Sequence, residues 1–349
     1  MNITTAKNIL RETIRSNMKA KLGGTPVARL LNPLLMGNPG IGKTEAWEQA
    51  AEELNVECRT VIVAQYDAGE MGGMPFLAKN KDTGESEYQR ARPDWLPSAG
   101  TGVLVLDELT QAPHSVLNIV AQLVNEHRIG EHALGDGWVI GGACNLLSNR
   151  AATNTLPAHV KDRFMFLPVE AEATSVIDRF NHLKLPSEMT SFLRDMPQLV
   201  EKFNPKADAS PSPRSWVRVA SIMGLSLPLN EKRLMIEGTV GESACNDFMV
   251  HLELHEDMVD PESVLSSPLT AELPSNASLS YILCAALSAR ANPKNIENIL
   301  IYSQRLPNQE HILFLIKDSL VRTGGKASKL MADKAMRKWM ETNGRELVL

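Results

Sequence analysis

The chain has 349 residues, 43% of them hydrophobic and 22% charged, which is the composition of an ordinary globular protein. At about 100–200 residues per domain, this length is enough for two or three domains that each bury a core. The formal net charge of −5 argues against a surface built mainly to hold nucleic acid, and no apolar stretch approaches the ~20 residues of a membrane span.

The N-terminal segment does not have the charged-then-apolar layout of a signal peptide. Four cysteines are scattered along the chain without CxxC spacing, so we expect neither a zinc site nor a disulfide framework. A reducing cytoplasm is therefore the expected setting.

Residues 5–22 predict a helix, and residues 33–170 then alternate short apolar runs with helical patterns. Such alternation is typical of an α/β domain with a parallel sheet. The helices between the apolar runs are expected near 43–54, 114–127 and 156–163. The expected strands are Pro33–Met36, Arg59–Ala64, Val103–Leu106, Trp138–Ala143 and Met165–Val169.

The remainder of the chain predicts helices and no strands. Residues 174–258 read as short helices separated by proline-containing loops, and helical periodicity runs again from about 277 to 343. Between them, Asp260–Asn276 carries three prolines and is predicted to be a linker. We therefore expect an α/β domain over residues 1–170, a helical lid over 171–259 and a helical C-terminal region over 260–349.

A phosphate-binding motif follows the first predicted strand. The segment fits G-x-x-x-x-G-K-[ST] without a mismatch and opens a helix, which is the context of a P-loop rather than of a chance glycine-rich turn. Glycines let backbone N–H groups surround phosphates, Lys43 reaches the β- and γ-phosphate oxygens, and Thr44 binds Mg²⁺. The sequence thus predicts an ATP and Mg²⁺ site at Gly37, Asn38, Pro39, Gly40, Ile41, Gly42, Lys43 and Thr44.

Two carboxylates, Asp107 and Glu108, end the third predicted strand. An apolar run that ends in acidic residues is also what a strand entering a solvated turn looks like. Its position after the P-loop unit favours a catalytic pair. In that case Asp107 holds Mg²⁺ from the outer coordination sphere and Glu108 polarises the attacking water.

These motifs, together with a strand that ends in Asn145 and a later Asp162-Arg163-Phe164, resemble the AAA+ superfamily of ATPases. More narrowly, the chain is similar to the MoxR branch. The matching segments lie between about residues 30 and 255, and the tail after 260 matches no motif. The segments are residues 37–44, 107–112, 156–164, 211–214 and 238–241.

The resemblance implies roles for three further polar residues. Asn145 would be sensor 1, an amide that contacts the γ-phosphate or the lytic water, and Arg214 would be sensor 2, which reaches the γ-phosphate from the lid. Arg163 would be the arginine finger offered to the nucleotide of a neighbouring subunit, with Arg150 as the competing candidate. The alternatives are a turn asparagine for Asn145 and a surface arginine at a helix start for Arg214. A finger of this kind contributes roughly 10³–10⁵ in rate.

A β-hairpin is predicted between the second strand and the acidic pair. Residues 71–78 and 86–89 flank Lys79–Glu85, and the centre of that segment, Asp-Thr-Gly, favours a tight turn. In the resembled clade a hairpin at this place points toward the central pore of a ring. An idle surface loop is the alternative.

The resemblance implies a ring-forming ATPase, a homo-oligomer of six subunits, that remodels or activates a partner protein complex. MoxR-type ATPases typically act with a von Willebrand factor A domain protein. A motor that translocates or unwinds DNA is the alternative, although the acidic net charge and a hairpin tip without clustered arginines or aromatics make nucleic acid the weaker candidate. A small-molecule kinase accounts for neither Asn145 and Arg214 nor the helical lid, and an intact Glu108 disfavours a nucleotide switch that does not hydrolyse.

Overall fold

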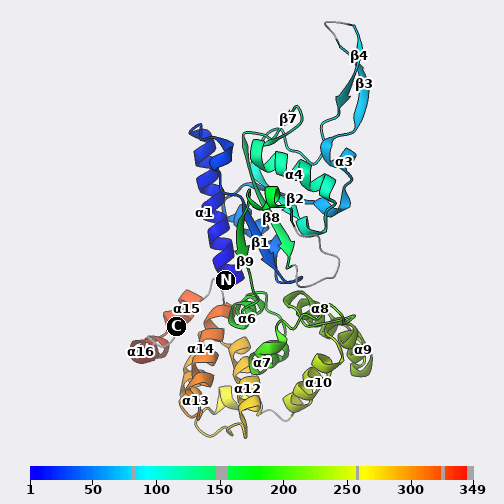
Figure 1. The fold of residues 1–349 in the computed structure, drawn as a ribbon. Coiled ribbons are helices and arrows are strands. Elements are labelled where there is room, and N and C mark those ends of the chain that lie inside the picture. Colours follow the sequence, from blue (N-terminus) through cyan, green and yellow to red (C-terminus); the bar gives the residue numbers. More distant parts are fainter. Residues whose placement is uncertain (81–83, 147–155, 257–258, 324–326, 344–349) are drawn as a thin grey trace. The chain divides into compact units, whose positions relative to one another are not determined.

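The computed structural model describes residues 1–80, 84–146, 156–256, 259–323 and 327–343. The chain divides into two compact units, Met1–Glu170 and Ala171–Leu349, which are shown in Figure 1 and are described here separately. The boundary coincides with the residue after which the strand pattern disappears from the sequence. Arg150, one of the two candidate arginine fingers, and the centre of the predicted turn at 81–83 lie outside the described residues.

Five parallel strands form the central sheet of the first unit, in the order β2-β5-β8-β1-β9. All five expected strands are present, which confirms the predicted α/β class. The second strand ends at Ile62, two residues early, because the apolar run continues into a 3₁₀ turn, η2 (Val63–Gln65), where Val63 is buried. The strands are β1 (Pro33–Gly37), β2 (Glu57–Ile62), β5 (Thr101–Asp107), β8 (Gly137–Asn145) and β9 (Met165–Pro168).

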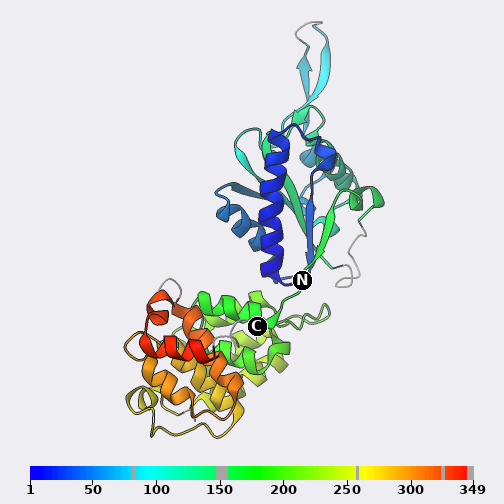
Figure 2. The same ribbon diagram turned by 90° about the vertical axis from the view of Figure 1, so that its left-hand side faces the viewer.

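Helices cover both faces of this sheet (Figure 2). The longer ones are α1 (Ile3–Leu22) and α2 (Lys43–Glu53) on one face and α4 (His114–Glu126) on the other. Successive residues of a strand point to opposite faces, so each strand supplies side chains to both layers. The shorter elements are η1 (Val27–Arg29), α3 (Ala68–Gly72), η3 (Leu109–Gln111), β6 (Arg128–Ile129), β7 (His132–Ala133) and α5 (Ala158–Lys161).

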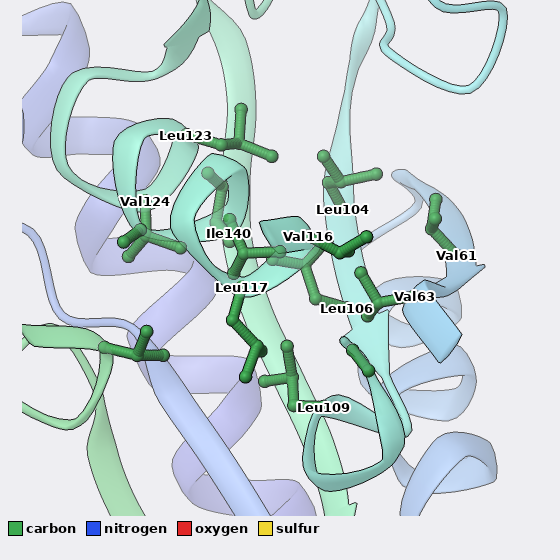
Figure 3. Close-up of a cluster of buried hydrophobic side chains, with 14 of the residues drawn as sticks. Val61, Val63, Leu104, Leu106, Leu109, Val116, Leu117, Leu123, Val124 and Ile140 are labelled. Atoms are coloured by element: carbon green, nitrogen blue, oxygen red, sulfur yellow. The ribbon is translucent and has the colours of Figure 1, made fainter. Parts of the chain in front are cut away.

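The hydrophobic core on the α4 side is built from aliphatic side chains, as Figure 3 shows. Leu104 and Ile140 of the sheet meet Val116 and Leu117, which lie on the buried face of α4. Burying one such side chain contributes about 1.5–3 kcal/mol. This layer fixes β5 and β8 side by side, and these two strands carry residues of the candidate site.

The predicted hairpin is present. β3 (Pro75–Lys79) and β4 (Ser86–Arg90) pair antiparallel, with Leu77 opposite Tyr88. α3 precedes the hairpin, and its first turn is closed by a capping box in which the side chains of Asp67 and Glu70 each accept a backbone N–H of the other residue. Figures 1 and 2 both show that the two strands stand clear of the rest of the first unit.

The second unit consists of helices in the described residues, as predicted. Its buried side chains form two hydrophobic clusters, one within residues 176–249 and one within 264–339. The predicted boundary at 260 lies between these clusters and stays a prediction. The helices are α6 (Ala173–His182), α7 (Ser187–Asp195), η5 (Pro197–Leu199), α8 (Pro213–Met223), α9 (Leu229–Val240), α10 (Glu242–Glu256), α11 (Pro261–Ser266), α12 (Ala277–Arg290), α13 (Ile296–Ser303), α14 (Gln309–Thr323), α15 (Ala327–Met331) and α16 (Lys334–Asn343).

The expected linker over Asp260–Asn276 was wrong in part, because α11 occupies its first residues. The Asp260 side chain accepts the N–H of Glu262 and caps the helix, and Pro261 stands at the first helical position, where its missing N–H costs nothing. Val264 is buried, and the carbonyl of Leu265 accepts a hydrogen bond from the Asn298 side chain at 2.7 Å. The first proline of this segment, Pro261, therefore starts a packed helix. Among the described residues, no helix is long and apolar enough to cross a bilayer.

Candidate functional site

The polar residues that the sequence singles out in the first unit gather at one edge of the sheet. β5, β8 and β1 are neighbours and run parallel, so their carboxyl ends meet at the same edge. Gly37, the last residue of β1, is in register with Asn145, the last residue of β8. Asp107 ends β5, the strand on the other side of β8. The sheet thus brings the P-loop, the acidic pair and Asn145 together.

The loop between β1 and α2 has a conformation that requires glycine. Gly40 and Gly42 have φ values of 81° and 92°, in the left-handed region that other residues rarely adopt. A Cβ on Gly37 would lie 2.4 Å from Ile41 Cδ1 and 2.5 Å from the carbonyl oxygen of Val169. Gly42 is the N-cap of α2 and offers no side chain to cap it. A helix N-terminus of this kind, reached by a glycine-rich loop, suits a phosphate group.

The ammonium group of Lys43 is buried at this edge, since the residue is only 8% exposed. Its Nζ donates to the carbonyl oxygens of Gly37 at 2.9 Å and Asn38 at 2.8 Å, and to Asn145 Oδ1 at 3.0 Å. A buried charge is stable only when it is hydrogen-bonded in this way. These bonds hold the cation between the P-loop and the end of β8.

Asp107 joins the P-loop helix to the acidic pair. Its Oδ2 accepts a hydrogen bond from Thr44 Oγ1 at 2.7 Å, and its Oδ1 accepts the backbone N–H of Glu108 at 2.7 Å. A hydroxyl and a carboxylate side by side form an all-oxygen donor set, which is what Mg²⁺ prefers. The two residues predicted to hold Mg²⁺ are therefore in contact with each other and fit that ion.

Glu108 has an unusual backbone. Its φ of 56° and ψ of 32° place it in the left-handed region, directly before the 3₁₀ turn η3. A non-glycine residue in this region costs roughly 1–2 kcal/mol. Such strain persists where the surrounding structure imposes it, and it concentrates at functional sites. The sequence indicated the carboxylate but gave no signal for this conformation.

The two predicted arginines, Arg163 and Arg214, come later in the sequence than the P-loop, the acidic pair and Asn145. Arg163 follows α5, and its Nη1 donates to the backbone carbonyl of His159, while its Nε is buried without a hydrogen-bond partner among the described residues. Arg214 belongs to the second unit, where it is exposed as the second residue of α8. A capping box between Ser212 and Ser215 fixes the start of that helix.

The hairpin carries exposed apolar side chains that sequence reasoning missed. Leu77 is 62% exposed and Tyr88, opposite it, is 80% exposed. Met74 and Phe76 are exposed as well. The missed signal was that these apolar residues lie in a two-stranded ribbon, which no second layer covers in the part of the chain that the structure describes. The contact surface expected for the hairpin comprised only its polar tip.

Comparisons with known proteins bear on the first unit. Residues 32–164 match the family profile described as AAA domain (dynein-related subfamily). No curated protein matches the chain. This match runs from the residue before β1 to the residue before β9 and includes every candidate site residue of the first unit.

Solved structures that are similar to this chain have low sequence identity. RuvB, the Holliday junction branch migration motor of Thermotoga maritima, is 14% identical with a TM-score of 0.37, over 75% of this chain and 76% of that chain. NtrX from Brucella abortus is 15% identical with a TM-score of 0.33, over 96% of this chain and 67% of that chain. The family match and the parallel sheet agree, so the first unit has the P-loop fold of an AAA domain over the matched residues 32–164.

Proposed function

We propose that the chain hydrolyses ATP at the carboxyl edge of its parallel sheet. The observation that carries this proposal is a pair of hydrogen bonds between the P-loop helix and the ends of two strands. Thr44 Oγ1 donates to Asp107 Oδ2 at 2.7 Å, and Lys43 Nζ donates to Asn145 Oδ1 at 3.0 Å. An AAA domain in the same residues supports an ATPase. The triphosphate would lie along Gly37–Thr44, where backbone N–H groups, the start of α2 and Lys43 favour negative charge.

Thr44 and Asp107 would hold Mg²⁺, which when bound neutralises charge on the β- and γ-phosphates. Glu108 would orient and polarise the attacking water, and the Asn145 amide would contact the γ-phosphate or that water. Phosphoryl transfer is limited by charge stabilisation, so donors that are already fixed in place are the main contribution of the protein. The bonds around Lys43 and Asp107 are consistent with such fixed donors.

The active form in this proposal is a ring of six copies in the cytoplasm. Arg163 would serve as the finger for the nucleotide of the adjacent copy, and Arg214 would act from the helical lid. The Arg163 guanidinium is held by the His159 carbonyl in the isolated chain, so a neighbouring subunit would have to offer it a better partner. A γ-phosphate does so, because its negatively charged oxygens can accept two parallel N–H bonds from the guanidinium, which a single carbonyl cannot.

We propose further that the ring is MoxR-like and remodels or activates a partner protein, with a von Willebrand factor A domain protein as the first candidate. The hairpin supports a protein client. Its exposed apolar side chains suit a polypeptide, and the charged side chains of its described residues are balanced, with Lys79 and Arg90 against Glu85 and Glu87. A groove that tracks a phosphate backbone needs an excess of cations instead.

The test of the partner class is ATP turnover by the purified chain in the presence of a von Willebrand factor A domain protein or of DNA, measured across a salt series. The proposal predicts stimulation by the protein partner that changes little with salt. Stimulation by DNA that falls steeply with increasing salt would instead establish the nucleic-acid motor. Stimulation by neither would contradict both partner classes while leaving ATP hydrolysis itself to be judged from the basal rate.

A further inference from the structure

Trp47 is the largest side chain that the P-loop helix buries, and the sequence motif does not include it. It lies on α2 four residues after Lys43, so the two side chains share one face of the helix, one turn apart. The residue is 1% exposed. The neighbouring buried residues of α2 are small: Ala46, Ala50 and Ala51. Trp47 is therefore the main side chain through which α2 packs on the sheet.

The indole is fitted to β8, the strand that ends in Asn145. Its Nε1 donates to the carbonyl oxygen of Gly142 at 3.1 Å. The ring lies against the backbone at Gly141, since a Cβ on that glycine would be 2.1 Å from Trp47 Cη2 and 2.3 Å from Cζ2. No residue other than glycine leaves space for the ring in this position.

Gly141 and Asn145 point to the same face of the sheet, because they are four residues apart on one strand. That face also receives Lys43, whose Nζ bonds Asn145 Oδ1 at 3.0 Å. α2 and β8 are thus joined at two points on one face. One joint is the Lys43–Asn145 contact in the site, and the other is the Trp47 indole on Gly141 and Gly142, away from the phosphates.

We infer that Trp47 is a positioning residue for hydrolysis, an inference that rests on the proposed ATPase function. The indole sets how far α2 slides along β8 and thereby where Lys43 and Thr44 lie relative to Asn145 and Asp107. Lys43 and Thr44 form the start of α2 and move with it, and the P-loop leads directly into this turn through its N-cap, Gly42. A shift of α2 therefore leaves the phosphate-binding groups intact and misaligns them with the groups on the strands.

Substitution of Trp47 should therefore change kcat and leave KM for ATP nearly unchanged. Trp47→Phe keeps an aromatic ring but removes the N–H group and part of the ring that contacts Gly141. We expect kcat to fall about ten- to hundredfold, the scale of a displacement of about 1 Å at a reacting centre. KM for ATP should stay within about threefold, because binding groups are retained. In a Trp47→Phe background, Asn145→Ala should lower kcat by a smaller factor than it does in the wild type, since the two residues act through one alignment.

Trp138→Phe is the matched control. Trp138 is fully buried at the amino-terminal end of the same strand, and its Nε1 donates to the Ala99 carbonyl at 2.8 Å. This variant loses an equivalent indole hydrogen bond in the same unit, far along β8 from Asn145. We expect Trp47→Phe and Trp138→Phe to change the melting temperature by similar amounts. The kcat should stay at the wild-type value in Trp138→Phe and fall in Trp47→Phe.

The experiment is steady-state ATP turnover and thermal unfolding of wild type, Trp47→Phe and Trp138→Phe. Equal kcat in wild type and Trp47→Phe, or an equal fall in both tryptophan variants, would overturn the positioning role while the ATPase function stands. A wild type without turnover would instead refute the proposed function, and the positioning role with it. If Trp47→Phe does not fold, Gly141→Ala tests the same joint from the strand. It should lower kcat at retained KM, and adding Trp47→Leu should lower kcat no further, whereas additive losses would overturn the inference.

Discussion

His127 shows how a single buried side chain can make the first unit sensitive to acid. Its Nδ1 lies 3.3 Å from the ammonium of Lys21, which also donates to the carbonyls of Gly135 and Trp138. Burial, together with the nearby Lys21 charge, lowers the pKa of His127 to about 3. The imidazole is therefore neutral in the folded protein over most of the acid range and acts as an acceptor for Lys21.

This pKa predicts the direction of the pH dependence of stability. Unfolded histidine titrates near pH 6.5, so between about pH 6.5 and pH 3 the unfolded chain binds a proton that the folded chain does not. Stability of the first unit should fall as the pH decreases through this window, by up to about 1.4 kcal/mol per pH unit from this residue. His127→Asn should weaken the dependence, because asparagine does not titrate and tolerates the left-handed φ of 52° found here. Urea unfolding at pH 7, 6, 5 and 4 checks this, and identical slopes in the two proteins would refute it.

At the scale of elements, the strands and the P-loop could be predicted because each is encoded locally. The apolar runs before Gly37 and Asp107 predict buried strands, and the motif from Gly37 to Thr44 fixes a loop and a helix start. Contacts between distant segments could not be predicted in this way. The space at Gly141 for the Trp47 ring depends on how α2 packs on β8, and nothing near residue 141 in the sequence indicates it.

The helix α11 and the exposure of the hairpin's apolar side chains escaped sequence reasoning for related reasons. α11 lies in a proline-containing stretch, where the pattern indicated a linker, yet Val264 finds a buried place in the second unit. The apolar residues of β3 and β4 would ordinarily predict burial, but their ribbon has no covering layer and they are exposed. Local patterns give the type of an element, whereas burial depends on the elements around it.

The exposed pair on the hairpin yields a prediction about coupling. Leu77→Ser together with Tyr88→Ser should leave basal ATP turnover within about threefold of wild type, because phosphoryl transfer depends on groups at the carboxyl edge of the sheet. Stimulation by a protein partner should be lost, since the apolar contact surface is gone. Lys79→Ala with Asn80→Ala is the matched pair of polar changes on the same hairpin, and it separates an apolar contact from a charged one. Unchanged partner stimulation in both double variants would show that the hairpin does not contact the client.

The assembled ring should hydrolyse ATP faster than the single chain does. A single copy lacks an arginine in trans, so specific activity should rise with protein concentration as rings form. Mixing Arg163→Ala with Lys43→Ala chains should restore part of the turnover, because a Lys43→Ala subunit still offers Arg163 to the intact P-loop of an Arg163→Ala neighbour. ATP turnover of each variant alone and of the mixture checks this. Full specific activity in a protein shown by light scattering to be monomeric would contradict the role of Arg163 in trans.

In the proposed mechanism, the strained Glu108, next to the Thr44–Asp107 contact, activates water for ATP hydrolysis. The most direct measurement is ATP binding and phosphate release by wild type, Glu108→Gln and Lys43→Ala with Mg²⁺ present. Glu108→Gln keeps the size of the side chain and removes its charge, so we expect ATP binding close to wild type and turnover reduced by at least about 10². Lys43→Ala removes a phosphate contact and should lose ATP binding. Turnover by Glu108→Gln at the wild-type rate would contradict the assignment of Glu108 and, with it, the proposed catalytic site.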